Sequence, residues 1–363
     1  MIERFFILTI LTLFVIGACK KDEEKEDNSP GFNQSELLVN WGDKIIVPSY
    51  KDYRIKANLF NTLCASLPTN PSTSELKNIH SSFEDLYLAW QKISFLEFGP
   101  ASDIALRAET NVYPTNYFEI ENKIITKDFS FSGASDLSQK GLPAIDYLLF
   151  GPNALVGNER ISYLKAISQL IYNNANIVFT EWSASENNYV EAFKSNTGND
   201  AGSSLGIIIN AMNQHLERFH RESKIGIPNG ERSFSKTPIA KNVEGYFSGT
   251  ESIALGVANL KALEALYLGV TTDGANGVGI EENLNTIGAK YNGGSLDDAI
   301  KSQFKSCFMA YDNISVPLKD AVTNENGKVS AVYIEIQKLT VLFKADVPAA
   351  LSILITYQDS DGD

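Results

Sequence analysis

Apolar residues recur at three- and four-residue steps along most of this chain, and this spacing constrains the fold more than any other feature. After Ser72, which opens the capping box STSE, the apolar stripe is Leu76, Ile79, Phe83, Leu86, Trp90 and Ile93. Such spacing places apolar side chains on one face of an α-helix. The same pattern predicts helices near residues 36–66, 115–126, 159–182, 203–222, 251–268, 296–311 and 329–346, the first kinked at Pro48. Strand patterns are scarce, and LSILITY at 351–357 fits either a strand or a helix end.

A chain of 363 residues, 44% of them hydrophobic, can form one large domain or two of ordinary size. Stretches rich in Gly and Pro at 225–238 and 271–279 predict long loops between the helices. LPAIDYLLFG at 142–151 aligns without gaps with LKALEALYLG at 260–269. This similarity indicates two related units, and chance similarity of Leu- and Ala-rich helices is the alternative. We therefore expect an all-α fold of two related helical bundles packed against each other, at 35–185 and 186–363.

The N-terminus is typical of an exported lipoprotein. Arg4 precedes the apolar run FFILTILTLFVIGAC, which is too short to span a bilayer comfortably and predicts a signal peptide at 1–18. IGAC at 16–19 resembles the bacterial lipobox, which implies cleavage before Cys19 and lipidation of that residue; a chance cysteine after an ordinary signal peptide is the alternative. Residues 19–34 are charged and predict a flexible tether. Lys20 and Lys21 followed by acids resemble surface-export signals of Bacteroidetes lipoproteins, which implies the cell envelope, at the outer membrane, periplasmic or surface-exposed.

The net charge of −13 argues against nucleic acid as a partner, because nucleic-acid binding needs a basic surface. Cys64 and Cys307 are the other cysteines of the chain. They can pair in an oxidising compartment or remain buried free thiols, and we favour free thiols.

Two acids interrupt apolar patterns. Glu97 follows the stripe that ends at Ile93 by a further step of four, so it faces the core if the helix continues that far, and Gly99-Pro100 then ends the helix. It either pairs with a base, Arg107 or Arg54, or belongs to a functional site. Asp146 lies in the apolar segment GLPAIDYLLFG. Pro143 suits the first turn of a helix, so stabilisation by the helix dipole is the simple role for Asp146.

Other polar motifs are weaker. Ser248 and Glu251 match a capping box for the next helix, whose N–H groups also form a modest anion site. The closing DSDGD resembles the start of a calcium loop but lacks the distal Glu, so it predicts a solvated tail. The histidines are His80, His215 and His220. HLERFH spaces the last two by five residues, which places them on different faces of an α-helix and argues against a zinc pair.

The chain resembles the imelysin family of secreted or lipid-anchored bacterial proteins. The resemblance rests on AWQKISFLEFGPA at 89–101, GLPAIDYLLFG at 141–151, FSGTES at 247–252 and TYQDSDGD at the end. It implies an all-helical fold of two related bundles, and a function as metallopeptidase or in iron uptake. Of the family motif Gly-x-His-x-x-Glu, Gly141 matches, whereas Pro143 replaces the histidine and Asp146 replaces the glutamate. Proline cannot ligate a metal or carry a proton, so peptidase activity of that kind is not expected.

We therefore expect a non-catalytic imelysin-like lipoprotein that binds a ligand or metal, a divalent or iron cation being a candidate, in connection with iron acquisition. Its partners would be the membrane, through the lipid anchor, and outer-membrane iron-transport components. A divergent metallopeptidase using Glu97, Asp146 and a histidine, or a surface adhesion or scaffold protein, are the alternatives. We expect Glu97 and Asp146 to approach one cavity between the two bundles. The candidate binding residues are Glu97, Arg107, Asp146, Ser248 and Glu251.

Overall fold

Helices form nearly all of the regular structure in the computed structural model, as the periodicity predicts. The model describes residues 32–183, 185, 187–249 and 251–357. The predicted signal peptide, the lipidation site Cys19, most of the tether and most of the closing motif lie outside the described residues. Contacts group the chain from Phe32 onward into one compact unit.

The elements up to residue 195 are α1 (Gln34–Val39), the π-helical η1 (Asn40–Ile46), α2 (Val47–Ser66), α3 (Thr73–Ile93), α4 (Pro100–Asp103), α5 (Leu106–Thr110), α6 (Tyr117–Thr126), the 3₁₀ turn η2 (Ala134–Gln139), α7 (Gly141–Phe150), α8 (Asn158–Trp182) and α9 (Tyr189–Ser195). The later elements are α10 (Ser204–Gln214), the π-helical η3 (His215–Gly226), the 3₁₀ turn η4 (Ala240–Asn242), α11 (Ser252–Leu268), α12 (Ile280–Thr286), β1 (Lys290–Tyr291), β2 (Gly294–Ser295), α13 (Leu296–Asp312), α14 (Leu318–Asn324), α15 (Asn326–Val341), the π-helical η5 (Leu342–Asp346) and α16 (Val347–Leu351). The strands form a two-residue antiparallel hairpin.

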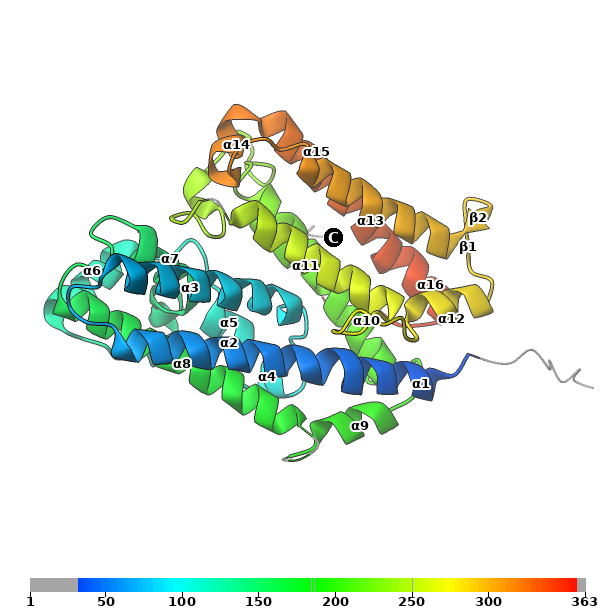
Figure 1. Cartoon of the computed structure of the whole chain (residues 1–363). Coiled ribbons are helices and arrows are strands. Elements are labelled where there is room, and N and C mark those ends of the chain that lie inside the picture. Colours follow the sequence, from blue (N-terminus) through cyan, green and yellow to red (C-terminus); the bar gives the residue numbers. More distant parts are fainter. Residues whose placement is uncertain (1–31, 184, 186, 250, 358–363) are drawn as a thin grey trace, which may run out of the picture. The chain divides into compact units, whose positions relative to one another are not determined.

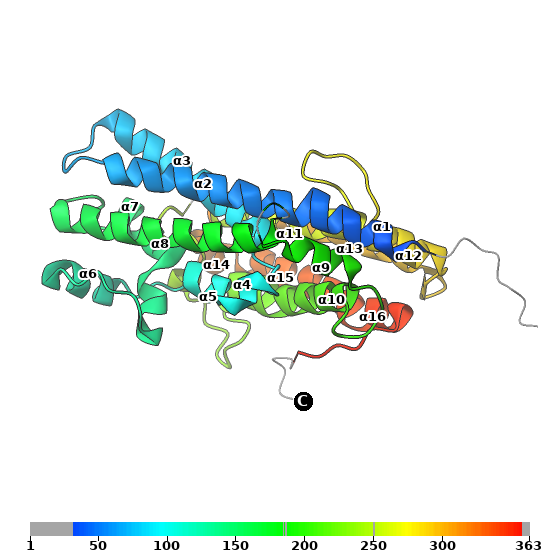
Figure 2. The same cartoon turned by 90° about the horizontal axis from the view of Figure 1, so that it is seen from below.

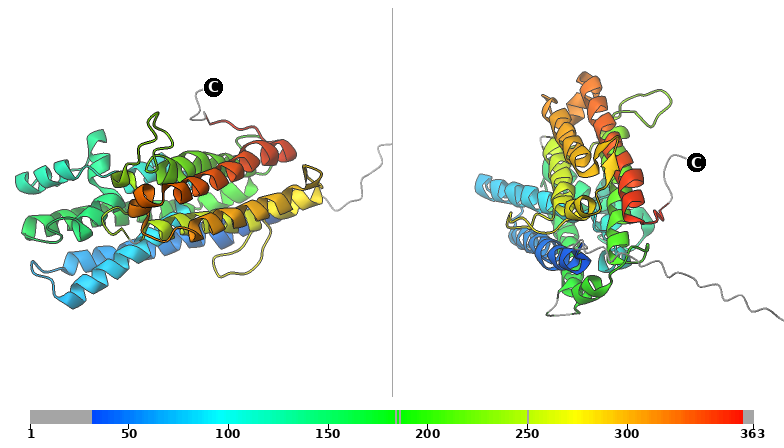
Figure 3. Two further views of the ribbon diagram at one scale, coloured as in Figure 1. Left: turned by 90° about the horizontal axis from the view of Figure 1, so that it is seen from above. Right: turned by 90° about the vertical axis from the view of Figure 1, so that its right-hand side faces the viewer.

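Two groups of helices lie side by side in Figure 1. In the first group α2 packs against both α3 and α8, and in the second α15 packs against α13 and η3. Helix α11 joins the groups, because it packs on α3 as well as on α13. Figures 2 and 3 show the same helices from below, from above and from one side. Buried apolar residues of both groups form one continuous core. The predicted domain boundary at 185/186 stays a prediction.

The N-terminal helix ties the two groups together. Helices α1, η1 and α2 follow one another without a break, so that residues 34–66 run as one helix. The indole Nε1 of Trp41 donates to the carbonyl of Leu266 at 3.0 Å, and Asn40 Nδ2 donates to the carbonyls of Gly269 and Val278 at 2.7 and 3.0 Å. These bonds attach the start of the first helix group to the C-terminal end of α11.

Each of the three π-helical segments ends two residues before a proline. Val47, Ile227 and Val347 precede Pro48, Pro228 and Pro348, and each donates its N–H to the carbonyl five residues back, that of Gly42, Glu222 and Leu342. Proline lacks an N–H and its ring clashes with the carbonyl four residues earlier in an α-helix. A wider i→i+5 turn ahead of the proline relieves that clash. Pro48 therefore follows a π-helical segment in a helix that continues through it.

Several local predictions have clear outcomes. The capping box of α3 is confirmed, because Ser72 and Glu75 cap each other. Cys64 and Cys307 are buried free thiols, as favoured from the sequence. The segment 351–357 contains the end of α16 and no strand within the part that the structure describes. None of the helices built from described residues is both long enough and apolar enough to cross a bilayer.

Candidate functional site

A cavity of about 350 Å³ lies where α5 and the end of α3 face η3. Its wall includes Glu97, which follows α3, Arg107 of α5, and His215 and Lys224 of η3. The aromatic residues Trp90, Tyr113 and Phe219 supply much of the remaining surface. A concave apolar wall with a few convergent polar groups is typical of a small-molecule site. We call this cavity the junction cavity, and its volume exceeds that of the two other cavities described below.

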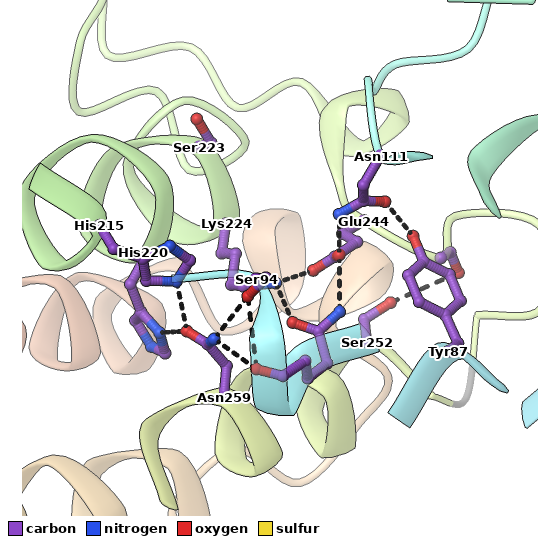
Figure 4. A network of polar contacts seen from close by, with 12 residues as sticks. Tyr87, Ser94, Asn111, His215, His220, Ser223, Lys224, Glu244, Ser252 and Asn259 are labelled. Carbon is purple, nitrogen blue, oxygen red and sulfur yellow. Dashed lines mark hydrogen bonds and ion pairs between the residues drawn. The ribbon is translucent and has the colours of Figure 1, made fainter. Parts of the chain in front are cut away.

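The π-helical geometry of η3 brings His215 and His220 to the same side chain. The Nε2 of His215 lies 2.9 Å from Asn259 Oδ1, and the Nδ1 of His220 lies 2.7 Å from the same oxygen. The expectation that the two histidines face apart is wrong, because it assumed 3.6 residues per turn, whereas the i→i+5 bonding of a π-helix aligns residues five apart. Figure 4 shows both rings beside Asn259.

The bonds of Asn259 fix which ring nitrogens carry a hydrogen. Its Nδ2 donates to the carbonyl of Gln91 and to Ser94 Oγ, both at 2.9 Å, so its Oδ1 is the acceptor. Both histidines must then donate to it: His215 from Nε2 and His220 from Nδ1. The Nε2 of His220 accepts from the hydroxyl of Tyr311 at 2.9 Å. The two rings are thus opposite tautomers when neutral.

Burial keeps both histidines uncharged at neutral pH. Desolvation lowers the pKa of His220 to about 4, although the hydrogen bond to Asn259 acts to raise it. Desolvation, with a smaller contribution from the charge of Arg107, lowers the pKa of His215 well below its usual range. A neutral His215 that donates from Nε2 carries an acceptor lone pair on Nδ1.

A buried ion pair continues the network beside the histidines (Figure 4). Lys224 Nζ contacts Glu244 Oε2 and donates to Gln91 Oε1 at 2.8 Å. Glu244 Oε1 accepts from the side-chain amides of Gln91 and Asn111 at 2.9 and 2.7 Å. Burial lowers the pKa of Lys224, whereas the carboxylate of Glu244 opposes that shift. The network joins α3, η3 and the loop before α11, so it holds the wall of the junction cavity in one arrangement.

Glu97 lies on the cavity wall but not on helix α3. The helix ends at Ile93, four residues before Glu97, because the chain turns there ahead of Gly99 and Pro100. The Glu97 carboxylate accepts the backbone N–H of Arg107, at 3.2 and 3.1 Å from its two oxygens. Burial raises the pKa of Glu97, and the nearby charge of Arg107 opposes this.

The guanidinium of Arg107 is held by other groups. Its Nε and Nη2 donate to the carbonyl of Ser94 at 3.2 and 2.7 Å, and its Cζ lies 3.8 Å from the ring centre of Phe219. The charge of Arg107 nevertheless favours the ionised form of Glu97. Arg54, the other base considered from the sequence, instead bonds Asn176 and lies over Phe179.

Asp146 lies in a different cavity of about 260 Å³, together with Pro143. Its Oδ2 and Oδ1 accept the backbone N–H groups of Phe247 and Ser248 at 2.8 and 2.9 Å. Burial raises the pKa of Asp146, and these two bonds oppose the rise. Helix α7 begins at Gly141, so Asp146 is its sixth residue, beyond the first turn where the helix dipole acts. The carboxylate instead anchors the loop before α11.

The expectation that Glu97 and Asp146 share one cavity is wrong. They line two separate cavities, and Tyr113 is a residue on the wall of both. The Glu97 carboxylate accepts the backbone N–H of Arg107. The Asp146 carboxylate accepts the backbone N–H groups of residues 247 and 248. The sequence placed both acids near helix ends, but Glu97 lies in the loop after α3 and Asp146 lies within α7, and they face different segments of the chain.

Ser248 and Glu251 line a third cavity, of about 120 Å³, with His80 and Glu84. Burial, followed by the neighbouring Glu251, raises the pKa of Glu84. The predicted capping box is wrong, since α11 begins at Ser252, with Glu251 as its N-cap residue. Ser248 lies too early to cap, and its hydroxyl donates to the carbonyl of Gly245.

The model of the imelysin family matches residues 46–344 of the chain. The chain is a member of the imelysin family. Among solved structures, an iron-regulated protein A precursor from Parabacteroides distasonis is similar with a TM-score of 0.72 and 17% identity, over 88% of this chain and 95% of that one. An imelysin-like protein from Psychrobacter arcticum is similar with a TM-score of 0.70 and 17% identity, over 89% of this chain and 97% of that one. The comparison with curated proteins found no match.

The motif positions of this imelysin do not fit a metal centre. Gly141 is required by the backbone, since its φ is 78° and a Cβ there would lie 2.3 Å from the carbonyl oxygen of Thr110. Pro143 offers no ligand atom, and both oxygens of Asp146 are engaged by backbone N–H groups. No group of three or more His, Cys, Asp and Glu side chains is arranged to hold a metal ion among the described residues.

The sequence did not single out the residues that build the network. Gln91, Lys224, Glu244 and Asn259 are buried polar residues of the imelysin that periodicity alone does not separate from exposed ones. For the histidine pair a signal did exist. Pro228 follows HLERFHRESKIGI, and in the described residues each of the three π-helical segments ends two residues before a proline.

Proposed function

We propose that this imelysin is a lipid-anchored envelope protein that binds a small ligand in the junction cavity, in connection with iron acquisition, and does not cleave peptides. The observation that carries the proposal is the cavity itself. It lies between the two helix groups, and its polar wall is held by the network around Lys224 and Glu244. A preorganised wall of this kind suits binding, because little ordering is needed when a ligand enters.

The link with iron rests on relatives. The neighbour from Parabacteroides distasonis is described as iron-regulated, and the imelysin resemblance implies roles in iron uptake. Outer-membrane iron transporters are the partners that this proposal implies, and the lipobox at Cys19 supplies the anchor. The iron connection does not require the protein to hold a metal itself. A ligand supplied to or taken from a transporter serves the same role.

The absence of peptidase activity is proposed from Pro143 and Asp146. Hydrolysis by a bound metal needs about three protein ligands and an open position for water. The motif supplies one carboxylate, and the backbone of Phe247 and Ser248 occupies it. Chelator-sensitive cleavage of an unfolded protein substrate by the purified chain, lost in Asp146→Ala, would support the alternative of a divergent metallopeptidase.

Blocking the cavity tests the binding proposal. Ala108 lines the junction cavity, so Ala108→Phe fills part of it, whereas Ala192→Phe on the exposed face of α9 is a matched control. Both variants and the unaltered chain are expressed in an iron-starved bacterial host, and the small molecules retained after purification are identified by mass spectrometry. We expect a molecule that is retained by the unaltered chain and the control but not by Ala108→Phe. Retention by all three proteins, or by none, contradicts the proposal.

A further inference from the structure

Two residues that line the junction cavity each carry a buried polar atom with no hydrogen-bond partner among the described residues. The atoms are Nδ1 of His215 and Nε1 of Trp90. The His215 side chain is almost wholly buried, with 2% of its surface exposed, and Trp90 is fully buried. A buried polar group without a partner destabilises the folded protein, so such groups in a native protein call for an explanation.

The two atoms have opposite hydrogen-bonding roles. His215 donates from Nε2 to Asn259 and is neutral, so its Nδ1 is an acceptor. The indole Nε1 of Trp90 is a donor only. Neither role can be reversed by rotating a flexible group, because the His215 ring is fixed by Asn259 and lies against Phe95 and Phe219.

We infer that the junction cavity binds a small hydroxyl-bearing molecule whose O–H donates to Nδ1 of His215. This inference rests on the proposed function, of which it names the ligand class. A hydroxyl group both donates and accepts, so a ligand of this class also supplies an acceptor of the kind that Nε1 of Trp90 lacks. The body of the ligand lies against the aromatic wall that includes Tyr113 and Phe219.

The charges on the wall favour a ligand without net charge. Lys224 is paired with Glu244, and Glu97 lies close to the charge of Arg107. A charged ligand would lose its hydration on entering the cavity, and the charges on the wall are already balanced by one another. A protonated amine is further disfavoured at Nδ1, because the positive charges of Arg107 and Lys224 already act on His215.

A pair of matched probes distinguishes the contribution of the hydroxyl group to binding from that of the aromatic ring. Benzyl alcohol and benzyl methyl ether share an aromatic ring, but only the alcohol has an O–H. The chain from residue 20 onward, labelled with ¹⁵N at its three histidines, is titrated with each probe by NMR. We expect the alcohol to bind about 5- to 10-fold more tightly than the ether and to shift the resonance of His215 Nδ1.

Variants assign the preference to particular atoms. His215→Phe keeps an aromatic ring and removes the acceptor, and we expect it to bind both probes equally. Trp90→Phe removes the indole N–H together with one of the two fused rings, so it should weaken binding of the alcohol more than binding of the ether. The control is Ser223→Ala, which also lines the cavity but whose hydroxyl already donates to the carbonyl of Arg218, so the preference should persist.

Equal binding of the two probes to the unaltered chain overturns the inference and leaves the cavity as a binding site. A preference for the alcohol that persists in His215→Phe overturns it as well. Binding of neither probe also rejects the hydroxyl class, and the proposed function is then judged separately by the molecule that the unaltered chain retains and Ala108→Phe does not.

Discussion

Two carboxylates that look alike in the sequence have different tasks in the folded chain. Glu97 forms part of the wall of the junction cavity, whereas both oxygens of Asp146 accept N–H groups of the loop before α11. The sequence reveals that both acids lie among apolar residues, because this follows from spacing. It does not reveal which backbone N–H groups face them, because these belong to α5, 10 residues from Glu97, and to the loop before α11, about 100 residues from Asp146.

The anchoring role of Asp146 predicts a loss of stability in Asp146→Asn. The amide keeps one acceptor oxygen but presents an NH₂ group to the second backbone N–H, so one buried donor loses its partner. We expect the free energy of unfolding to fall by roughly 2 kcal/mol. Denaturant unfolding measures this, with Asp85→Asn in a half-exposed surface pair as the control, for which a change below about 1 kcal/mol is expected. Unchanged stability of Asp146→Asn would show that the carboxylate does not hold the loop.

His220 predicts a loss of stability at acidic pH. Its pKa is about 6.5 in the unfolded chain and about 4 when folded, so the unfolded chain binds the proton more readily. Keeping His220 neutral therefore contributes roughly 3 kcal/mol to the free energy of unfolding above pH 6.5, and this contribution is lost as the pH falls toward 4. Unfolding free energies measured between pH 7 and 4.5 should therefore decrease less in His220→Gln than in the unaltered chain. Parallel pH profiles for the two proteins contradict a buried neutral His220.

At the scale of elements, the sequence predicts the helices well and their internal geometry poorly. The capping box before α3 and the apolar stripes of α3 and α11 identify helices because these signals are local. Whether a helix continues with i→i+4 or i→i+5 bonds changes the facing of every following residue. The prolines at 48, 228 and 348 mark the π-helical segments, but only the structure shows that the helices continue toward them without a break.

The geometry of η3 predicts opposite tautomers for its two histidines. On an α-helix, residues five apart point about 140° from each other and could not both reach Asn259. We expect His215 to carry its hydrogen on Nε2 and His220 on Nδ1, since both donate to the same oxygen. The ¹⁵N spectrum of the labelled histidines distinguishes the two forms, with His80→Gln used to assign the third ring. The same tautomer for His215 and His220 would be incompatible with the π-helical arrangement.

At the scale of the whole molecule, the sequence predicts the all-α class and the imelysin family, because periodicity and motif order extend over most of the chain. It does not predict the junction cavity. The wall combines residues of α5, η3 and the segment after α3. These segments come close together only because α11 packs on α3. Polar residues such as Lys224 and Glu244 become informative only once they are seen to be buried together.

The lipobox predicts where the molecule is held. Replacing Cys19 by Ser removes the thiol that would be lipidated, and several acyl chains are needed for stable anchoring. We expect Cys19→Ser to appear in the soluble envelope fraction, whereas the unaltered protein fractionates with membranes. Fractionation after a high-salt wash measures this, with Cys64→Ser as a control that keeps the anchor. A Cys19→Ser protein that stays with the membranes would mean that another segment holds it there.

A crystal structure of the chain with the small molecule that it retains from an iron-starved host tests the central claim most directly. The predicted result is ligand density in the junction cavity, with a hydroxyl oxygen within hydrogen-bond distance of Nδ1 of His215 and the ligand body beside Tyr113 and Phe219. Asp146 should still bind the N–H groups of Phe247 and Ser248. Density beside Pro143 and Asp146 instead, or a metal ion held by Asp146, would contradict the account.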